Sequence, residues 1–375
     1  MIDIKKAEYA TKALFFACGV GFSSWASRIP EIKEKLHLND AEFGSVLFAM
    51  PIGSLCALPI AAIVVEKFGS KNVVLTASLF YLVVMPLLGL ANSGLFLAIT
   101  LFFFGFGGDL LNISMNVQAV GVEKAQNRSF MSFFHGIFSV GFMIGAALGG
   151  FLAKFEITPA IHLGLVGLMV ILVGSISYPI LLSHDEKPAE PSPLFAWPDK
   201  SLIILGIICL CAMLCEGAMA DWSVIYYKKV MANPNGFVTA AFTAFSVAMV
   251  IGRLFGDGFL RKTSLTKLLL INSLLLISGM SIALIYTSPI NVIIGFGITG
   301  LGLSTMVPMI YSEAGHSKTM SSGAALAAIT TIGMFGFMIG PVFIGFISEL
   351  SNLRIALSSL IVLGIVSAFF TRKIQ

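Results

Sequence analysis

Asp109, Asn112 and Asn116 are the polar residues best placed for chemistry, because they interrupt a long apolar stretch. Asn112 and Asn116 follow Asp109 by three and seven residues, so a helix would carry all three on one face. A carboxylate can exchange a proton, and two amides offer hydrogen-bond donors and acceptors to a polar ligand. We expect Asp109 to couple protons and Asn112, Asn116 and the off-face Gln118 to bind a solute. The alternative is a polar clamp between two helices.

Two further acids and one histidine lie inside other apolar stretches. An ionisable side chain in hydrocarbon is costly unless it faces a cavity or a partner, so each is a functional candidate. We expect Glu216 in the outer half of its helix as a proton-coupling group. Asp221 is either a second such group or a solvated helix end, beside a Trp222 that fits the interfacial aromatic belt. His135 titrates in the physiological range and is a candidate proton relay, with helix packing as the alternative.

Basic residues at the ends of apolar stretches suggest binding or gating. Arg253 and Asp257 are four residues apart and so lie on one helix face, which predicts an ion pair, within this helix or with another helix, at an inner gate. Arg28 lies beside Trp25 near the end of the first apolar stretch. Arg28 can bind an anionic group or snorkel to the membrane interface, and snorkelling is the favoured interpretation. Trp25 and Arg28 are kept as substrate-binding candidates.

The elements that must position these residues are transmembrane helices. Of the 375 residues, 57% are hydrophobic and 11% are charged, whereas soluble domains have about 45–50% apolar and about 25% charged residues. Apolar runs recur that can each cross a hydrocarbon layer of roughly 30 Å. We therefore expect an all-α integral membrane protein, whose first helix is too long for a cleaved signal. Twelve helices are predicted, over residues 9–29, 41–65, 72–92, 95–122, 129–153, 160–182, 200–226, 236–260, 266–287, 289–313, 320–348 and 353–371.

A repeated motif divides the chain into two halves. The sequence Gly-Phe-Met-Ile-Gly at 141–145 recurs at 336–340, and the Gly-Phe pair at 150–151 recurs at 345–346. Two similar six-helix halves are a known transporter layout, with the substrate site near the membrane midplane. We therefore predict two six-helix bundles, 1–182 and 200–375, joined by a proline-rich and charged linker, 183–199.

The distribution of basic residues predicts the orientation in the membrane. Lys and Arg are more frequent in the loops on the side of the two termini than in the loops on the other side. Cytoplasmic loops carry an excess of these residues, so both termini should be cytoplasmic. A multi-pass protein of the cell inner membrane is expected.

One loop resembles a known family signature. Residues 62–71, Ala-Ile-Val-Val-Glu-Lys-Phe-Gly-Ser-Lys, are similar to the GxxxDRxGRR signature of the major facilitator superfamily. Glu66 stands at the acidic position, Lys67 and Lys71 stand at basic positions, and Gly69 matches, whereas an alanine replaces the first glycine. The charges of this loop are expected to close an inner gate by pairing with a neighbouring helix, with ordinary loop charge as the alternative.

Other segments resemble an uncharacterised bacterial inner-membrane branch of this superfamily. They are Ser24–Pro30, Phe134–Gly136 and Glu216–Gly217 with Asp221–Trp222. In the second half, Gly256–Lys262 keeps the glycines and the basic pair of the sister loop of the family signature, without an acid before the basic residues. The resemblance covers the whole chain. It implies the major facilitator fold and alternating-access transport, but it names no substrate.

A carrier is the function that these features favour. The sequence has no Walker A, HExxH or GxSxG motif, so we expect no enzyme, no cofactor and no metal site. A channel would more naturally show rings of like charge. The first hypothesis is proton-coupled symport of a small polar solute, such as a sugar, a sugar derivative or an organic acid. Proton-driven drug or metabolite efflux is the alternative, and a receptor on the same scaffold is a third. The expected partners are a small-molecule substrate, the proton and the lipid bilayer, without nucleic acid, and we expect a monomer.

Overall fold

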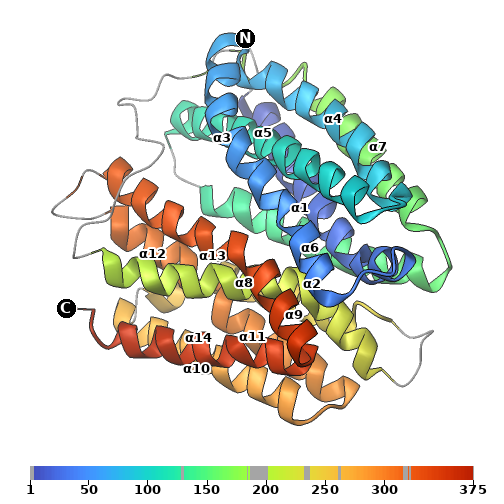
Figure 1. Cartoon of the computed structure of the whole chain (residues 1–375). Coiled ribbons are helices and arrows are strands. Elements are labelled where there is room, and N and C mark those ends of the chain that lie inside the picture. The colour runs from blue at the N-terminus through green and yellow to red at the C-terminus, as the bar shows by residue number, and fades with distance from the viewer. Residues whose placement is uncertain are drawn as a thin grey trace. The chain divides into compact units, whose positions relative to one another are not determined.

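The computed structural model describes residues 4–127, 131–183, 185, 202–231, 237–260, 263–315, 320 and 322–374. Every regular element in these ranges is an α-helix (Figure 1). The first seven helices are α1 (Ile4–Lys35), α2 (Asp40–Leu47), α3 (Ala49–Phe68), α4 (Ser70–Leu90), α5 (Gly94–Gln126), α6 (Met131–Lys154) and α7 (Pro159–Ser177). The others are α8 (Ile203–Val230), α9 (Ala240–Leu260), α10 (Leu265–Ile285), α11 (Pro289–Ser304), α12 (Met306–Gly315), α13 (Ser322–Leu350) and α14 (Leu353–Thr371).

These helices confirm the predicted all-α membrane fold. In the described residues, ten segments are long and apolar enough to cross a membrane, two of them formed by α2 with α3 and by α11 with α12. The other two predicted spans coincide with the long α1 and with α9, whose apolar part, Ala240–Phe255, is shorter, and neither helix is among these ten.

The two interrupted spans break at single residues, Phe48 and Thr305. A proline follows each break by three residues, at Pro51 and Pro308. Proline has no N–H and cannot bond the carbonyl four residues earlier, so the helix is weakened at this point.

Several helices begin at residues that suit a helix N-terminus. The cap side chain accepts a hydrogen bond from the backbone N–H three residues later, which satisfies one of the free donors of the first turn. These caps are Ser93, Thr158, Ser264, Ser288 and Asn352.

Contacts divide the chain into two compact units. Unit 1 comprises residues 1–38 and 46–189, and unit 2 comprises residues 39–45 and 190–375. The segment 39–45 packs in unit 2 although it precedes α3 of unit 1 in sequence, which was not predicted. Most of the predicted linker, 183–199, lies outside the described residues.

The repeated glycine motif has the same packing role in each unit. In unit 1, α1 packs on α6, and a Cβ at Gly141 would collide with the carbonyl oxygen of Phe16. In unit 2, α8 packs on α13, and a Cβ at Gly336 would collide with the carbonyl oxygen of Leu210. Small residues let membrane helices approach this closely, which explains why the motif occurs twice.

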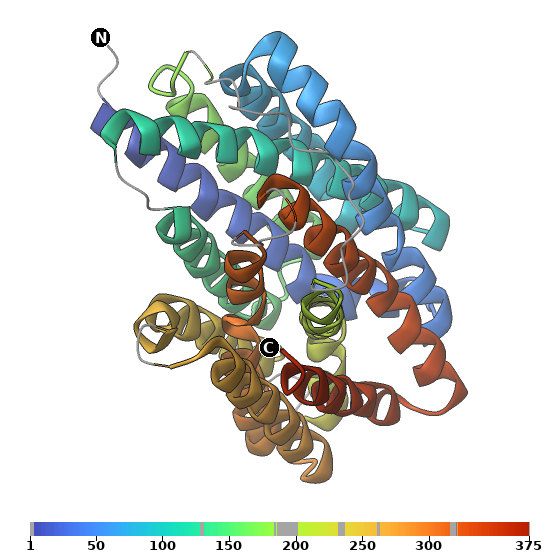
Figure 2. The same cartoon turned by 90° about the vertical axis from the view of Figure 1, so that its left-hand side faces the viewer.

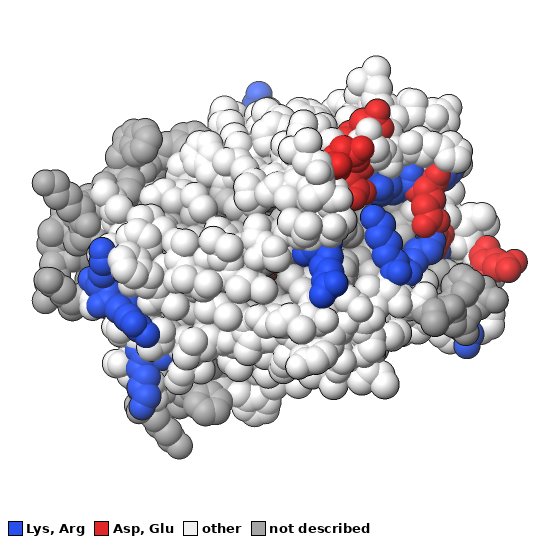
Figure 3. Space-filling model, turned by 60° about the horizontal axis from the view of Figure 1, so that its bottom comes forward, with Lys and Arg blue, Asp and Glu red and all other residues white. Residues whose placement is uncertain are grey.

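The other helices complete each unit. In unit 1, α3 packs on α5 and α4 packs on α7, and in unit 2, α11 packs between α9 and α10 while α14 packs on α10 (Figures 1 and 2). Many large apolar side chains remain exposed along the helices. On the face in Figure 3, charged residues gather toward two opposite ends and leave a wide, almost uncharged band. Such a surface suits a multi-pass protein in a lipid bilayer.

Candidate functional site

The polar stripe of α5 is half-buried and partly hydrogen-bonded within itself. The Asn116 amide donates to the backbone oxygen of Asn112 at 2.8 Å and to its side-chain oxygen at 3.0 Å. One turn earlier, the Asp109 carboxylate has the side chains of Asn112 and Ser54 as hydrogen-bonding neighbours. The structure thus brings the three predicted residues together on one face and adds Ser54 from α3, which the sequence analysis missed.

Two glycines allow α3 to approach Asp109. A Cβ at Gly53 or at Gly105 would collide with a backbone carbonyl of the facing helix, so only glycine permits this crossing. The close crossing brings Ser54 of α3 against α5, where its hydroxyl also lies 3.3 Å from the Gly105 oxygen. Tyr81 of α4 approaches from another side, because a Cβ at Gly108 would lie 2.9 Å from its hydroxyl oxygen.

The Gln118 side chain is buried and is held by hydrogen bonds within unit 1. Its side chain is 1% exposed, and its amide nitrogen donates to the Ser70 hydroxyl at 2.7 Å and to the Leu182 oxygen at 3.0 Å. Its amide oxygen accepts from the Leu182 N–H at 2.8 Å. Both ends of the amide are thus engaged within unit 1, so we leave Gln118 out of the proposed solute site.

Arg28 is fully buried, so the snorkelling interpretation is wrong. Its Nε donates to Nδ1 of His162 at 2.9 Å, and its Nη1 donates to the Glu31 carboxylate at 2.7 and 3.0 Å. Because Nδ1 of His162 accepts a hydrogen bond, the neutral ring carries its proton on Nε2. His162 of α7 was not predicted, although a histidine within an apolar stretch is a signal that could have found it.

Trp25 and His135 contrast in exposure. Trp25 is fully buried, and its indole nitrogen has no hydrogen-bond partner among the described residues. His135 is exposed at the start of α6, and its ring stands nearly perpendicular to that of Phe15, with the ring centroids 5.3 Å apart. Solute binding by Trp25 and proton relay by His135 stay predictions.

The Glu216 carboxylate pairs with Arg253. Oε1 of Glu216 in α8 lies 3.0 Å from Nη2 of Arg253 in α9, and the side chains are 31% and 25% exposed. We had expected Glu216 in the outer half of its helix, but α8 runs from Ile203 to Val230, so Glu216 lies near the middle. Arg253 thus forms an ion pair with a residue of another helix, and the predicted pairing with Asp257 is not tested, because that side chain lies outside the described residues.

The break between α11 and α12 helps to hold Arg253. Pro308 cannot donate to the Ser304 carbonyl, and this oxygen accepts a hydrogen bond from Nε of Arg253 at 3.4 Å. Gly252 makes room, because a Cβ there would collide with the Ser304 side chain. The helix break therefore supplies an acceptor to a charged side chain at membrane depth.

Two expectations for the end of α8 are wrong. Asp221 is 4% exposed and Trp222 is fully buried, so neither is a solvated helix end or a member of an interfacial belt. The reason is that α8 continues to Val230, and the ring of Phe43 covers Trp222 at 5.9 Å.

The predicted gate loop is exposed and locally capped. Glu66 and Lys67 are exposed at the end of α3, and Gly69 joins α3 to α4 with a φ of 81°, which favours glycine. Asp185 accepts hydrogen bonds from the Ser70 N–H and hydroxyl at the start of α4. Lys71 lies over the ring of Tyr178 at 4.8 Å. Gate closure by these residues stays a prediction.

Comparisons with known proteins agree with this architecture. Residues 13–319 match the model of the Major Facilitator Superfamily. An uncharacterised MFS-type transporter of Yersinia pestis is 35% identical over 98% of this chain and 95% of its own length. The membrane protein MosC of Rhizobium meliloti is 28% identical over 96% of this chain and 88% of its own. A mutant of the nucleoside transporter NupG superposes with a TM-score of 0.81 at 12% identity, over 98% of this chain and 99% of the other.

Proposed function

Because the chain belongs to the Major Facilitator Superfamily, a family of membrane transporters, we propose that it carries a small polar solute by proton-coupled symport. Asn112 and Asn116 of unit 1 would bind the solute, and Asp109 and Glu216 would exchange the proton. An inner-membrane location with cytoplasmic termini and an inner gate formed by Glu66, Lys67, Gly69 and Lys71 belong to the same proposal.

The observation that carries this proposal is the partial exposure of the Glu216–Arg253 pair. A charged pair in the middle of a membrane helix is too costly to face lipid. A pair sealed within protein would be unable to exchange a proton with water. With side-chain exposures of 31% and 25%, this pair supports a water-filled passage at membrane depth.

The pair also suggests how a proton and a solute are linked. When Glu216 takes up a proton, its attraction for Arg253 falls, and Nη2 of Arg253 can donate to an oxygen of the solute in place of Glu216. Asp109 offers a second carboxylate, in unit 1, whose hydrogen-bonding neighbours Ser54 and Asn112 can adjust to either protonation state. Polar groups next to each acid favour a polar solute over an apolar drug.

A ligand screen followed by transport tests this proposal. Purified protein would be melted with nucleosides, neutral sugars, sugar acids, dicarboxylates and cationic dyes, because a ligand of the folded state raises the melting temperature. The polar ligand that stabilises most would then be offered to proteoliposomes with and without an inward proton gradient. We expect gradient-dependent uptake that Asp109→Asn and Glu216→Gln each remove, whereas Glu313→Gln, at an exposed acid of α12, leaves it unchanged.

Four results would contradict the proposal. Uptake that ignores the proton gradient would exclude coupling, and stabilisation by cationic dyes alone would favour efflux. If Asp109→Asn and Glu216→Gln both kept full gradient-driven uptake, neither acid would take part in proton coupling. Ligand binding without any movement of the ligand would indicate a receptor.

A further inference from the structure

A second polar site lies within unit 2, away from the Glu216–Arg253 pair. A cavity of about 350 Å³ is lined by the end of α8, the turn between α10 and α11, and the junction of α13 with α14. Asp40, from the segment 39–45 that packs in this unit, completes the lining. With cytoplasmic termini, as the loop charges predict, these helix ends face the outside of the cell.

Lys229 on one side of the cavity is only loosely held. Its Nζ lies 3.6 Å from Oδ2 of Asp40, which is too long for a hydrogen bond, and its side chain is 55% exposed. The same Asp40 oxygen accepts a hydrogen bond from the hydroxyl of Ser348. The ammonium of Lys229 can therefore turn to another anion at little cost.

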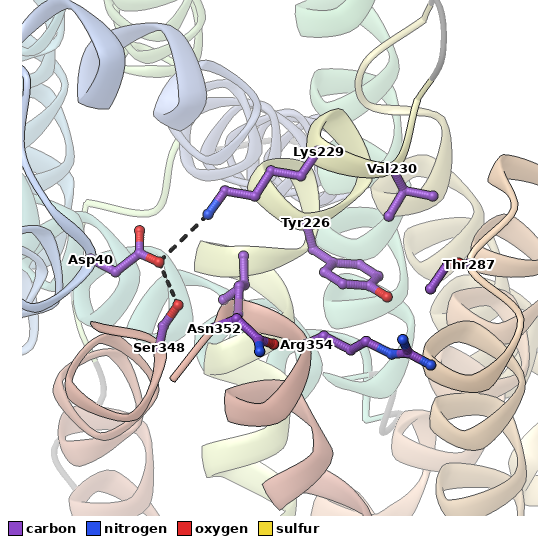
Figure 4. Close-up of a pocket in the computed structure, with 9 residues that line it drawn as sticks. Asp40, Tyr226, Lys229, Val230, Thr287, Ser348, Asn352 and Arg354 are labelled. Carbon is purple, nitrogen blue, oxygen red and sulfur yellow. Dashed lines mark hydrogen bonds and ion pairs between the residues drawn. The ribbon is translucent and has the colours of Figure 1, made fainter. Parts of the chain in front are cut away.

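Arg354 supplies a second cation. In Figure 4, the Lys229 ammonium lies on one side of the Tyr226 ring and the Arg354 guanidinium lies on the other. Nη2 of Arg354 donates to the Ile285 oxygen at 3.3 Å, which leaves most of its five N–H groups for a ligand. The oxygen of Asn352 accepts from the Ile355 N–H, so its amide nitrogen is the group left to donate.

Among the described lining residues, two cations, Lys229 and Arg354, face one carboxylate, that of Asp40. The ring of Tyr226 with Val230 and Leu353 adds an apolar wall. The volume lies within the range of about 300–1,000 Å³ that is usual for small-molecule pockets. We propose that this cavity binds a small organic monoanion, a carboxylate on a ring or a short carbon chain, which displaces Asp40 from Lys229.

This proposal predicts that substitutions of neighbouring lining residues change the affinity for the anion in opposite directions. Lys229→Gln and Arg354→Gln should weaken binding, because each removes a charge that attracts the ligand. Asp40→Asn should strengthen binding, because it removes the competing negative charge while its amide oxygen can still accept from Ser348. A residue that only supports the fold would not tighten binding when it is changed.

The experiment is calorimetric titration of the purified full-length protein with matched acid and amide probes. The probes are benzoate with benzamide and glucuronate with glucuronamide, which differ in charge but little in shape. We expect at least one acid to bind about tenfold more tightly than its amide, which corresponds to about 1.4 kcal/mol. Each of the two Gln variants should weaken acid binding about three- to tenfold, Asp40→Asn should tighten it about threefold, and added salt should weaken it.

Controls keep the outcome decisive. Lys154→Gln, at an exposed lysine of unit 1, should not change binding, and Lys229→Arg with Arg354→Lys should keep the preference for the acid in case a Gln variant fails to fold. Equal binding of acid and amide, unchanged binding in folded Lys229→Gln and Arg354→Gln, or no binding of any probe at about 10 mM would overturn the proposal. Glu216→Gln should keep acid binding while it loses proton-driven uptake, so failure of the cavity and failure of the transport proposal are distinguishable.

Discussion

The Glu216–Arg253 pair offers the sharpest test of the structure, by a double-mutant cycle. Glu216→Gln and Arg253→Gln each remove one charge but keep much of the side-chain volume. Either change leaves the other charge at membrane depth without its partner, which is costly for a group that cannot face lipid. The double variant removes both charges, so its loss of stability should be smaller than the sum of the two single losses.

The size of this coupling follows from the distance and the exposure. At 3.0 Å, two unit charges attract by about 5.5 kcal/mol at an effective dielectric constant of about 20, and by about 1.4 kcal/mol in bulk water. A quarter to a third of each side chain is exposed, so solvent screens part of the attraction. Ordering the two side chains costs further free energy. We therefore expect a coupling free energy of about 1–3 kcal/mol.

Detergent-solubilised protein unfolded by increasing mole fractions of SDS would supply the four stabilities. Glu313→Gln, an exposed acid that serves as the matched control, should shift stability by no more than about 0.5 kcal/mol. The exchanged variant, Glu216→Arg with Arg253→Glu, should regain part of the stability that the single reversals lose. Additive losses, with a coupling near zero, would refute the ion pair as an energetic unit.

Three further predictions concern unit 1 and use the same unfolding assay. Gly105→Ala should lose about 2 kcal/mol or more because its Cβ meets the Met50 carbonyl, whereas Gly164→Ala, whose Cβ would lie 3.7 Å from Pro86, should stay near wild type; equal stabilities would contradict the helix crossing. Gln118→Leu should lower the free energy of unfolding by about 1–3 kcal/mol, because the Ser70 hydroxyl and the Leu182 N–H lose their hydrogen-bond partner. An unchanged stability would contradict a structural role for these hydrogen bonds. His162→Phe should lower the free energy of unfolding by about 1–3 kcal/mol, because Nε of Arg28 loses its acceptor. Arg28→Lys should also be less stable than wild type, because only the guanidinium fork can bond both Glu31 and His162.

Much of the fold was predictable because it depends on local properties of the chain. Apolar length sets how many helices can cross a bilayer, and Ser, Thr and Asn before Pro or apolar residues mark where several of them begin. The repeated glycine motif indicated two halves, and the structure adds the physical reason, a close helix crossing at Gly141 and at Gly336.

Pairings between distant residues could not be read in the same way. The spacing of Arg253 and Asp257 could not name Glu216 of another helix as the partner that the structure shows for Arg253, and the predicted pairing with Asp257 lies outside the described residues. The burial of Arg28 depends on His162, which is 134 residues away in sequence. The position of 39–45 in unit 2 likewise reflects tertiary packing, in which Gly44 meets Gly345 of α13.

Each unit holds an arginine paired with an acid, and solvation separates their roles. Arg28 is fully buried, and the fork of its guanidinium is divided between Glu31 and His162. A buried guanidinium cannot leave its partners without losing several hydrogen bonds that water is not there to replace, so Arg28 acts as a fixed joint between α1 and α7. Arg253 and Glu216 are each partly exposed, and water can replace either partner as the pair opens. Glu31 is 32% exposed, about as much as Glu216, so the difference lies in the arginine: Arg28 is held in place by burial, whereas Arg253 can separate from its acid. Our proposal therefore assigns proton exchange to Glu216, whose pair can break and re-form.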